Sequence, residues 1–256
     1  MRSPTCVLLF FVGLLAGQRA VAQQTDQLTT RQWQSWYIAE ERVDILPRWQ
    51  LRLELETDRN GLWSTENQTQ ARLLGLYELS NKVRLGAGIA YFTQEADSLT
   101  AFDDPLGTEI RPHQEVILSL NEGKTNWESR FRLEERFLQD DLADIADDAY
   151  SFNFRLRLRV EASRTLWKPH DTDRGTLRAV VNNEVMINAG RQTSTVFNQN
   201  RAYAGLNYAL SEQFEVEAGY MKVIQQRSSG NAFWNRDVLR LTLIHAWRTR
   251  RAEQSR

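Results

Sequence analysis

The stretch Phe-Asn-Phe-Arg-Leu-Arg-Leu-Arg-Val at residues 152–160 alternates strictly between apolar and polar side chains. Successive side chains of an extended strand point to opposite faces of the sheet, so this stretch has one apolar face and one face with three arginines. A soluble sheet rarely carries that combination, whereas a strand between lipid and a wet, charged lumen carries it readily. The stretch therefore predicts one wall strand of a transmembrane β-barrel.

The same alternation recurs along the chain in further segments of about 10–12 residues, near the length that a tilted strand needs to cross a bilayer. The eleven predicted segments are 32–41, 48–57, 67–79, 82–93, 110–120, 126–137, 150–163, 174–186, 198–209, 213–224 and 236–247. Short connections alternate with long ones, as short periplasmic turns alternate with longer outer loops in such barrels. The predicted fold class is all-β, a transmembrane antiparallel up-and-down barrel of ten to twelve strands.

The predicted number of segments, eleven, is odd, whereas bacterial barrels made of one chain have even strand numbers. Either one strand lies unnoticed within 23–31 or 94–109, or the first segment is not part of the wall. We favour twelve strands over ten.

The predicted inner faces carry mainly arginine and glutamate, and the outer faces are aliphatic and aromatic. We predict that the lumen is lined by Arg130, Arg132, Glu134, Arg155, Arg157, Arg159, Glu184, Arg201, Glu215 and Glu217. Aromatic residues also lie near the ends of the segments, where amphipathic rings meet lipid headgroups. On this assignment, replacing the outward Leu156 by arginine is harmful, and replacing the inward Arg157 by leucine is far milder.

A charged lumen has two interpretations. It is either a constriction that selects anionic solutes or a salt-bridged filling of a narrow barrel. Eight-stranded barrels are filled by side chains, and sixteen or more strands leave a channel, so at ten to twelve strands we favour the filled lumen. The predicted function is therefore structural or a narrow solute passage, with the solute unknown. The alternatives are an outer-membrane lipid hydrolase and a soluble periplasmic β-sandwich that binds a ligand.

Candidate catalytic and metal-binding residues are few. The histidines are His113, His170 and His245, and no serine stands at a revealing spacing from His245, which shares the lipid-facing side of its segment. The acidic run at 140–148 lacks the spacing and the glycine of a calcium loop, so a solvated loop is preferred. We predict no catalytic residue, no metal site and no cofactor, and hence no enzyme.

The start of the chain resembles a secretory signal, with Arg2, an apolar run and the small-x-small site Ala20-Val21-Ala22. The predicted divisions are a cleaved signal peptide at 1–22, a barrel domain at 23–247 and a basic periplasmic tail at 248–256. Cys6, the one cysteine, would leave with the signal, and so would Arg2 and Arg19. Cleavage would change the numbers of basic and acidic residues from 32 and 33 to 30 and 33. This nearly even charge does not suggest nucleic acid as a partner.

Three motifs of the C-terminal half are Asn182-Asn183-Glu184-Val185, Phe-Asn-Gln-Asn-Arg-Ala-Tyr-Ala-Gly-Leu at 197–206, and Glu217-Ala218-Gly219-Tyr220. They resemble an uncharacterised outer-membrane β-barrel family of Gram-negative bacteria, a domain of unknown function. The strand at 152–160 and the hairpin at 33–56 are similar to it as well. The resemblance implies the fold and a location in the cell outer membrane. It also implies outer-membrane lipid and, during biogenesis, the barrel-assembly machinery as partners. It implies no activity.

Overall fold

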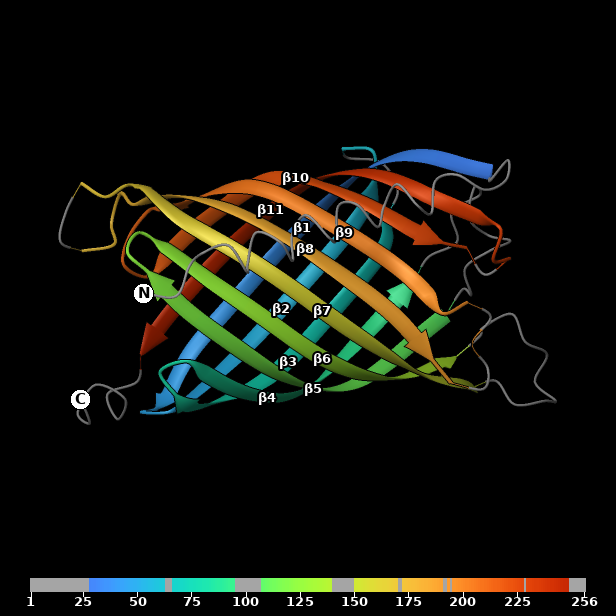
Figure 1. Cartoon of the computed structure of the whole chain (residues 1–256), viewed down its shortest axis with the longest axis horizontal. Helices are drawn as coiled ribbons and strands as arrows, with labels where there is room; N and C mark the ends of the chain where they lie inside the picture. The colour runs from blue at the N-terminus through green and yellow to red at the C-terminus, as the bar shows by residue number, and fades with distance from the viewer. Residues whose placement is uncertain are drawn as a thin grey trace, which may run out of the picture.

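The computed structural model describes residues 28–62, 66–94, 107–139, 150–169, 172–190, 193, 195–227 and 229–248. Within them, eleven tilted strands follow one another around a closed barrel, and β1 lies beside β11 (Figure 1). The strands are β1 (Leu28–Leu46), β2 (Trp49–Asn60), β3 (Glu66–Ser80), β4 (Val83–Gln94), β5 (Gly107–Glu122), β6 (Thr125–Gln139), β7 (Tyr150–Trp167), β8 (Leu177–Ala189), β9 (Phe197–Ala209), β10 (Phe214–Gln226) and β11 (Ala232–Arg248).

Each predicted segment coincides with one of these strands, so the all-β barrel is confirmed. The preference for twelve strands is wrong for the described residues. Residues 28–31 belong to β1 and 107–109 to β5, while 95–106 lie outside the described residues. The alternative of a soluble sandwich is also wrong, because the strands form one closed sheet.

An odd number of strands closes because β1 and β11 run in the same direction. They pair in parallel register from Leu28↔Ala232 to Asp44↔Arg248, whereas the neighbouring pairs elsewhere are antiparallel. Parallel pairing is slightly less stable per residue than antiparallel pairing. β1 has 19 residues, so it pairs with β11 along the whole length of β11.

The two ends of the barrel differ in their connections. The short-turn end, at the left of Figure 1, carries the short connections 47–48, 81–82, 123–124 and 210–213, the nine-residue connection 168–176 and the end of β11. Gly123 adopts a φ of 58° in one of these two-residue turns, a left-handed backbone that glycine accepts without a steric penalty. The long-connection end lies opposite and includes the start of β1.

The outer wall is an apolar band to which most strands contribute. Its exposed residues include Leu51, Leu53, Leu55, Leu73, Leu85, Ile89, Val116, Leu118, Phe131, Leu156, Val181, Leu206, Leu239, Leu241 and Leu243. Leu156 is 51% exposed, while its neighbours Arg155 and Arg157 are 4% and 8% exposed. A continuous exposed apolar surface of this kind is unsuited to water and matches a wall that faces lipid.

Exposed aromatic rings mark both edges of this band. Trp49, Trp167 and Trp247 lie toward the short-turn end, and Trp33 and Tyr91 lie toward the opposite end. Such rings are usual where a membrane protein meets the lipid headgroups. Among the described residues, no helix is long and apolar enough to cross a bilayer.

The position of Leu156 in the wall gives a first prediction. Leu156→Arg should destabilise the membrane-inserted barrel by about 2–4 kcal/mol, because it places a charge near the middle of the apolar band. Urea unfolding in phospholipid vesicles, followed by heat-modifiable gel migration, measures the change in free energy of unfolding.

The matched control is Leu166→Arg, on the same face of β7 but close to the short-turn end. This change should destabilise by about 0–1 kcal/mol, because charge is tolerated near the headgroups. Equal effects of the two variants would show that β7 crosses no membrane.

Candidate functional site: an arginine-rich funnel

The lumen contains a cavity of about 300 Å³, which we call the funnel. Its lining comes from all eleven strands, and on most of them from the half nearer the long-connection end. Ten lining residues are arginines, namely Arg72, Arg111, Arg130, Arg136, Arg155, Arg157, Arg159, Arg201, Arg236 and Arg240. Five are carboxylates, namely Glu54, Glu56, Asp58, Glu109 and Glu184. The lining therefore carries a clear excess of positive charge.

Arg157 is the centre of the ion pairs along β6, β7 and β8. Its guanidinium donates to Glu134 at 2.7 Å and to Glu184 at 2.8 Å. Arg155 also donates to Glu134, at 2.7 Å, and Arg130 donates to Glu184 at 2.6 Å. Each of these two carboxylates is therefore held by two arginines. Because all five side chains are buried, the pairs are little screened by water.

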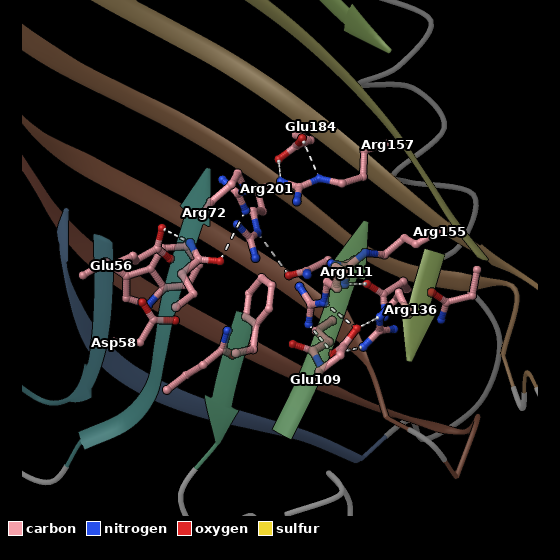
Figure 2. A pocket seen from close by; sticks show the side chains of 18 of the residues that line it. Glu56, Asp58, Arg72, Glu109, Arg111, Arg136, Arg155, Arg157, Glu184 and Arg201 are labelled. Carbon is pink, nitrogen blue, oxygen red and sulfur yellow. Dashed lines mark hydrogen bonds and ion pairs between the residues drawn. The ribbon is translucent and has the colours of Figure 1, made fainter. Parts of the chain in front are cut away.

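A second group of pairs lines the wall formed by β2, β3, β5 and β6. Glu109 accepts hydrogen bonds from both Arg111 and Arg136, as Figure 2 shows. Arg72 pairs with Glu54 from the neighbouring strand. The guanidinium of Arg111 also lies over the Phe92 ring, 3.4 Å from its centroid. These contacts orient most funnel arginines toward partners in the wall.

The funnel ends on a layer of buried side chains, which we call the floor. The floor consists of Leu74, Leu76, His113, Glu115, Ile117, Val180 and Tyr203. Each follows the lining residues of its strand toward the short-turn end, and none is more than 5% exposed. On β3, β5, β8 and β9 the funnel lining therefore stops at these buried side chains.

Glycines in the wall make room for two of the floor residues. Gly205 of β9 lies beside Gly219 of β10, and a Cβ on Gly219 would come within 2.6 Å of the Tyr203 hydroxyl. A Cβ on Gly88 would lie 2.9 Å from the His113 ring. The missing side chains thus let Tyr203 and His113 lie against the wall.

The ten predicted lumen residues occupy three environments. Arg130, Arg155, Arg157, Arg159, Glu184 and Arg201 line the funnel. Arg132 and Glu134 are buried in the ion pairs behind its surface, where Arg132 holds Glu115 at 2.6 Å. Glu215 and Glu217 lie nearer the short-turn end and accept hydrogen bonds from Asn207 and Arg240. The structure thus places these side chains inside, and their roles stay predictions.

The predicted lumen residues do not include several lining residues from the first half of the chain, such as Arg72, Glu109 and Arg111. A signal was present, because the charged residues Glu109, Arg111 and Glu115 alternate in β5. It was obscured because Leu74, Leu76 and Ile117 also point inward. A strand that is apolar on both faces loses the period of two on which the assignment depends.

The histidines do not form a catalytic site with a described hydroxyl. His113 belongs to the floor, and His170 lies outside the described residues. Nδ1 of His245 lies 2.8 Å from Glu41 on the outer wall, and its ring stacks on Phe214. A carboxylate that orients a histidine is one part of a hydrolytic triad, but no nucleophile accompanies it in these contacts. The described residues contain no cluster suited to a metal, and the acidic run at 140–148 lies outside them.

The closed wall, its apolar outer band and its charged lumen define a β-barrel of the membrane-spanning class. The family model described as "Protein of unknown function (DUF2490)" matches residues 33–234, and the chain belongs to that family. The predicted resemblance is thereby confirmed. A comparison with curated proteins found no match. Among solved structures, the chain is similar to the NanC porin, with 12% sequence identity and a TM-score of 0.46, over 83% of this chain and 97% of that chain.

The ion pairs around Arg157 give a second prediction. Glu134→Gln should destabilise the barrel by about 3–5 kcal/mol, because it leaves Arg155 and Arg157 buried without one of their partners. The free energy of unfolding in urea measures the effect.

Glu135→Gln, the same chemical change one residue further on the outer face, is the control. It should stay within about 0.5 kcal/mol of the unmodified protein. If Glu134→Gln and Glu135→Gln destabilise the barrel equally, the inner ion pairs do not stabilise this region.

Proposed function

We propose that this protein is an outer-membrane β-barrel that admits small polar solutes, especially those with an anionic group, into the funnel from outside the cell. In this proposal the buried floor closes the lumen, and the barrel is a narrow passage in its shut state. The observation that carries this proposal is the lining of ten arginines and five carboxylates directly above a buried floor. Arginine is the side chain best suited to binding carboxylates and phosphates.

The apolar outer band supports the location. In such barrels, the short turns face the periplasm and the long connections face outward. The funnel opens at the long-connection end, so it would receive solutes from outside. The signal peptide and the basic tail, which lie almost entirely outside the described residues, stay predictions consistent with this orientation.

The free volume favours a solute over a purely structural filling. A lumen that serves only as a filling would leave no open cavity among its side chains. The funnel instead keeps about 300 Å³ open, which is near the lower bound for sites that hold small molecules. The lipid hydrolase receives less support, because His245 has a carboxylate beside it and no described nucleophile.

Planar-bilayer conductance of the refolded mature chain tests the closed floor. The unmodified barrel should carry no sustained current. The variant Leu74→Ala/Leu76→Ala/Ile117→Ala should conduct and prefer anions, because it removes bulk beneath an arginine-rich funnel. The control, Leu73→Ala/Leu85→Ala/Leu118→Ala, makes the same kind of change on the outer face and should carry no sustained current.

Each result has a defined meaning. A sustained current through the unmodified barrel would support a passage and contradict the closed floor. No current through the unmodified barrel, the floor variant or the control, all folded, would contradict the passage and leave a structural role.

Thiol labelling of intact cells tests the orientation. Cys6 is the one cysteine and lies within the predicted signal peptide, so introduced cysteines would be unique in the mature chain. Thr108→Cys in the funnel should react with a membrane-impermeant maleimide added outside, and Ile117→Cys in the floor should not. Labelling of Thr108→Cys only after the cells are opened would place the funnel on the periplasmic side.

A further inference from the structure

Arg201 differs from the other arginines of the funnel in its partners. Its Nε donates to Gln199 at 3.2 Å, and its guanidinium lies 4.7 Å from the centroid of the Trp36 ring. Glu184 is its register partner on β8, but that carboxylate is held by Arg130 and Arg157. Among the described residues, no carboxylate lies at ion-pair distance from Arg201. Its guanidinium therefore lines the cavity without an anion of its own.

Two carboxylates of the funnel also have no cationic partner among the described residues. Glu56 and Asp58 lie two residues apart on the inner face of β2 and line the cavity. Glu56 accepts a hydrogen bond from the neutral Gln70 at 2.6 Å. Asp58 is 6% exposed, and its Oδ1 is buried without a hydrogen-bond partner.

A buried guanidinium, or two neighbouring buried carboxyl groups, without a counter-charge is unfavourable unless something else compensates it. Arg201 and the two carboxylates cannot compensate one another by contact, because they are farther apart than an ion pair. They line one cavity. In Figure 2, Glu56 and Asp58 lie to the lower left of Arg201 and Arg72.

We propose that the funnel binds a small zwitterion of the amino-acid class, with its carboxylate on Arg201 and its ammonium group on Glu56 and Asp58. Resting on the proposed function, this assignment names the solute class. A simple anion would leave Glu56 and Asp58 without a cation, and a simple cation would leave Arg201 without an anion. A molecule with both charges compensates all three residues, and the planar guanidinium suits bidentate binding of its carboxylate.

Isothermal titration calorimetry of the refolded, detergent-solubilised mature chain tests the assignment with three probes of equal chain length. The probes are 4-aminobutanoate, butanoate and butylamine. The zwitterion should bind at least about tenfold more tightly than either singly charged probe, because it makes one more charge-assisted contact. Repeating the titration from glycine to 6-aminohexanoate measures the separation of charges that fits best.

Two variants assign the two ends of the ligand. Arg201→Gln should weaken 4-aminobutanoate binding by about tenfold to a hundredfold, by loss of one contact between charged groups. Asp58→Asn should weaken 4-aminobutanoate toward the level of butanoate and should not weaken butanoate itself. Quenching of Trp36 fluorescence on binding, absent in Trp36→Phe, would place the carboxylate end beside Arg201.

Folding and charge controls keep the test decisive. Arg178→Gln removes an arginine near the short-turn end, where it interacts with Asp173 and Glu215 outside the funnel, and should bind normally. Arg201→Lys keeps the charge and should bind better than Arg201→Gln. Heat-modifiable migration confirms that each variant is folded.

The outcomes separate this assignment from the proposed function. Equal affinity for butanoate and 4-aminobutanoate would replace the zwitterion by a simple anion. No binding of any probe to the folded barrel would overturn the assignment, whatever the conductance. Binding of 4-aminobutanoate without conductance in the floor variant would uphold the assignment and overturn the passage.

Discussion

The hydrogen-bonded closure of β1 on β11 is the constraint on which the rest of the structure depends. In lipid there is no water to satisfy a free strand edge, so a sheet that crosses a membrane must close on itself. Closure with eleven strands fixes a narrow lumen, between the filled barrels of eight strands and the open channels of sixteen or more. Long arginine and glutamate side chains from different strands therefore meet inside it.

The narrow lumen explains why the inner charges are paired. An isolated buried charge is strongly unfavourable, so each inward arginine needs a carboxylate close by or a contact with the solute. Glu134 and Glu184 show the first solution, since each is shared by two arginines. Arg201, Glu56 and Asp58 line the same cavity without an oppositely charged partner among the described residues. This lack of partners distinguishes a binding surface from a filling.

The period of two made the wall predictable from the sequence. It located all eleven strands and separated Leu156 from Arg157, because a side chain that faces lipid and one that faces the lumen differ sharply in polarity. The strand number was not predictable in this way. Whether β1 pairs with β11 in parallel depends on contacts between the two ends of the chain, which no local pattern contains.

The charged lining of the funnel was predictable from the sequence, whereas the position of its floor was not. Arg155, Arg157 and Arg201 follow from alternation, but the floor depends on Leu74, Leu76 and Ile117, whose inward direction contradicts the simple polar-in pattern. The position of Tyr203 and His113 depends on glycines of neighbouring strands, so it appears only when the register is known.

Arg157 shows why the direction of a side chain does not decide how well its replacement is tolerated. From the sequence, Arg157→Leu is expected to be mild because the residue does not face lipid. In the structure, Arg157 holds both Glu134 and Glu184, and its removal leaves each carboxylate with one arginine fewer in a buried place. Breaking such a pair is strongly destabilising, so an inward charge in a narrow barrel can matter as much as an outward apolar residue. The lumen of this barrel is therefore part of its core as well as its candidate site.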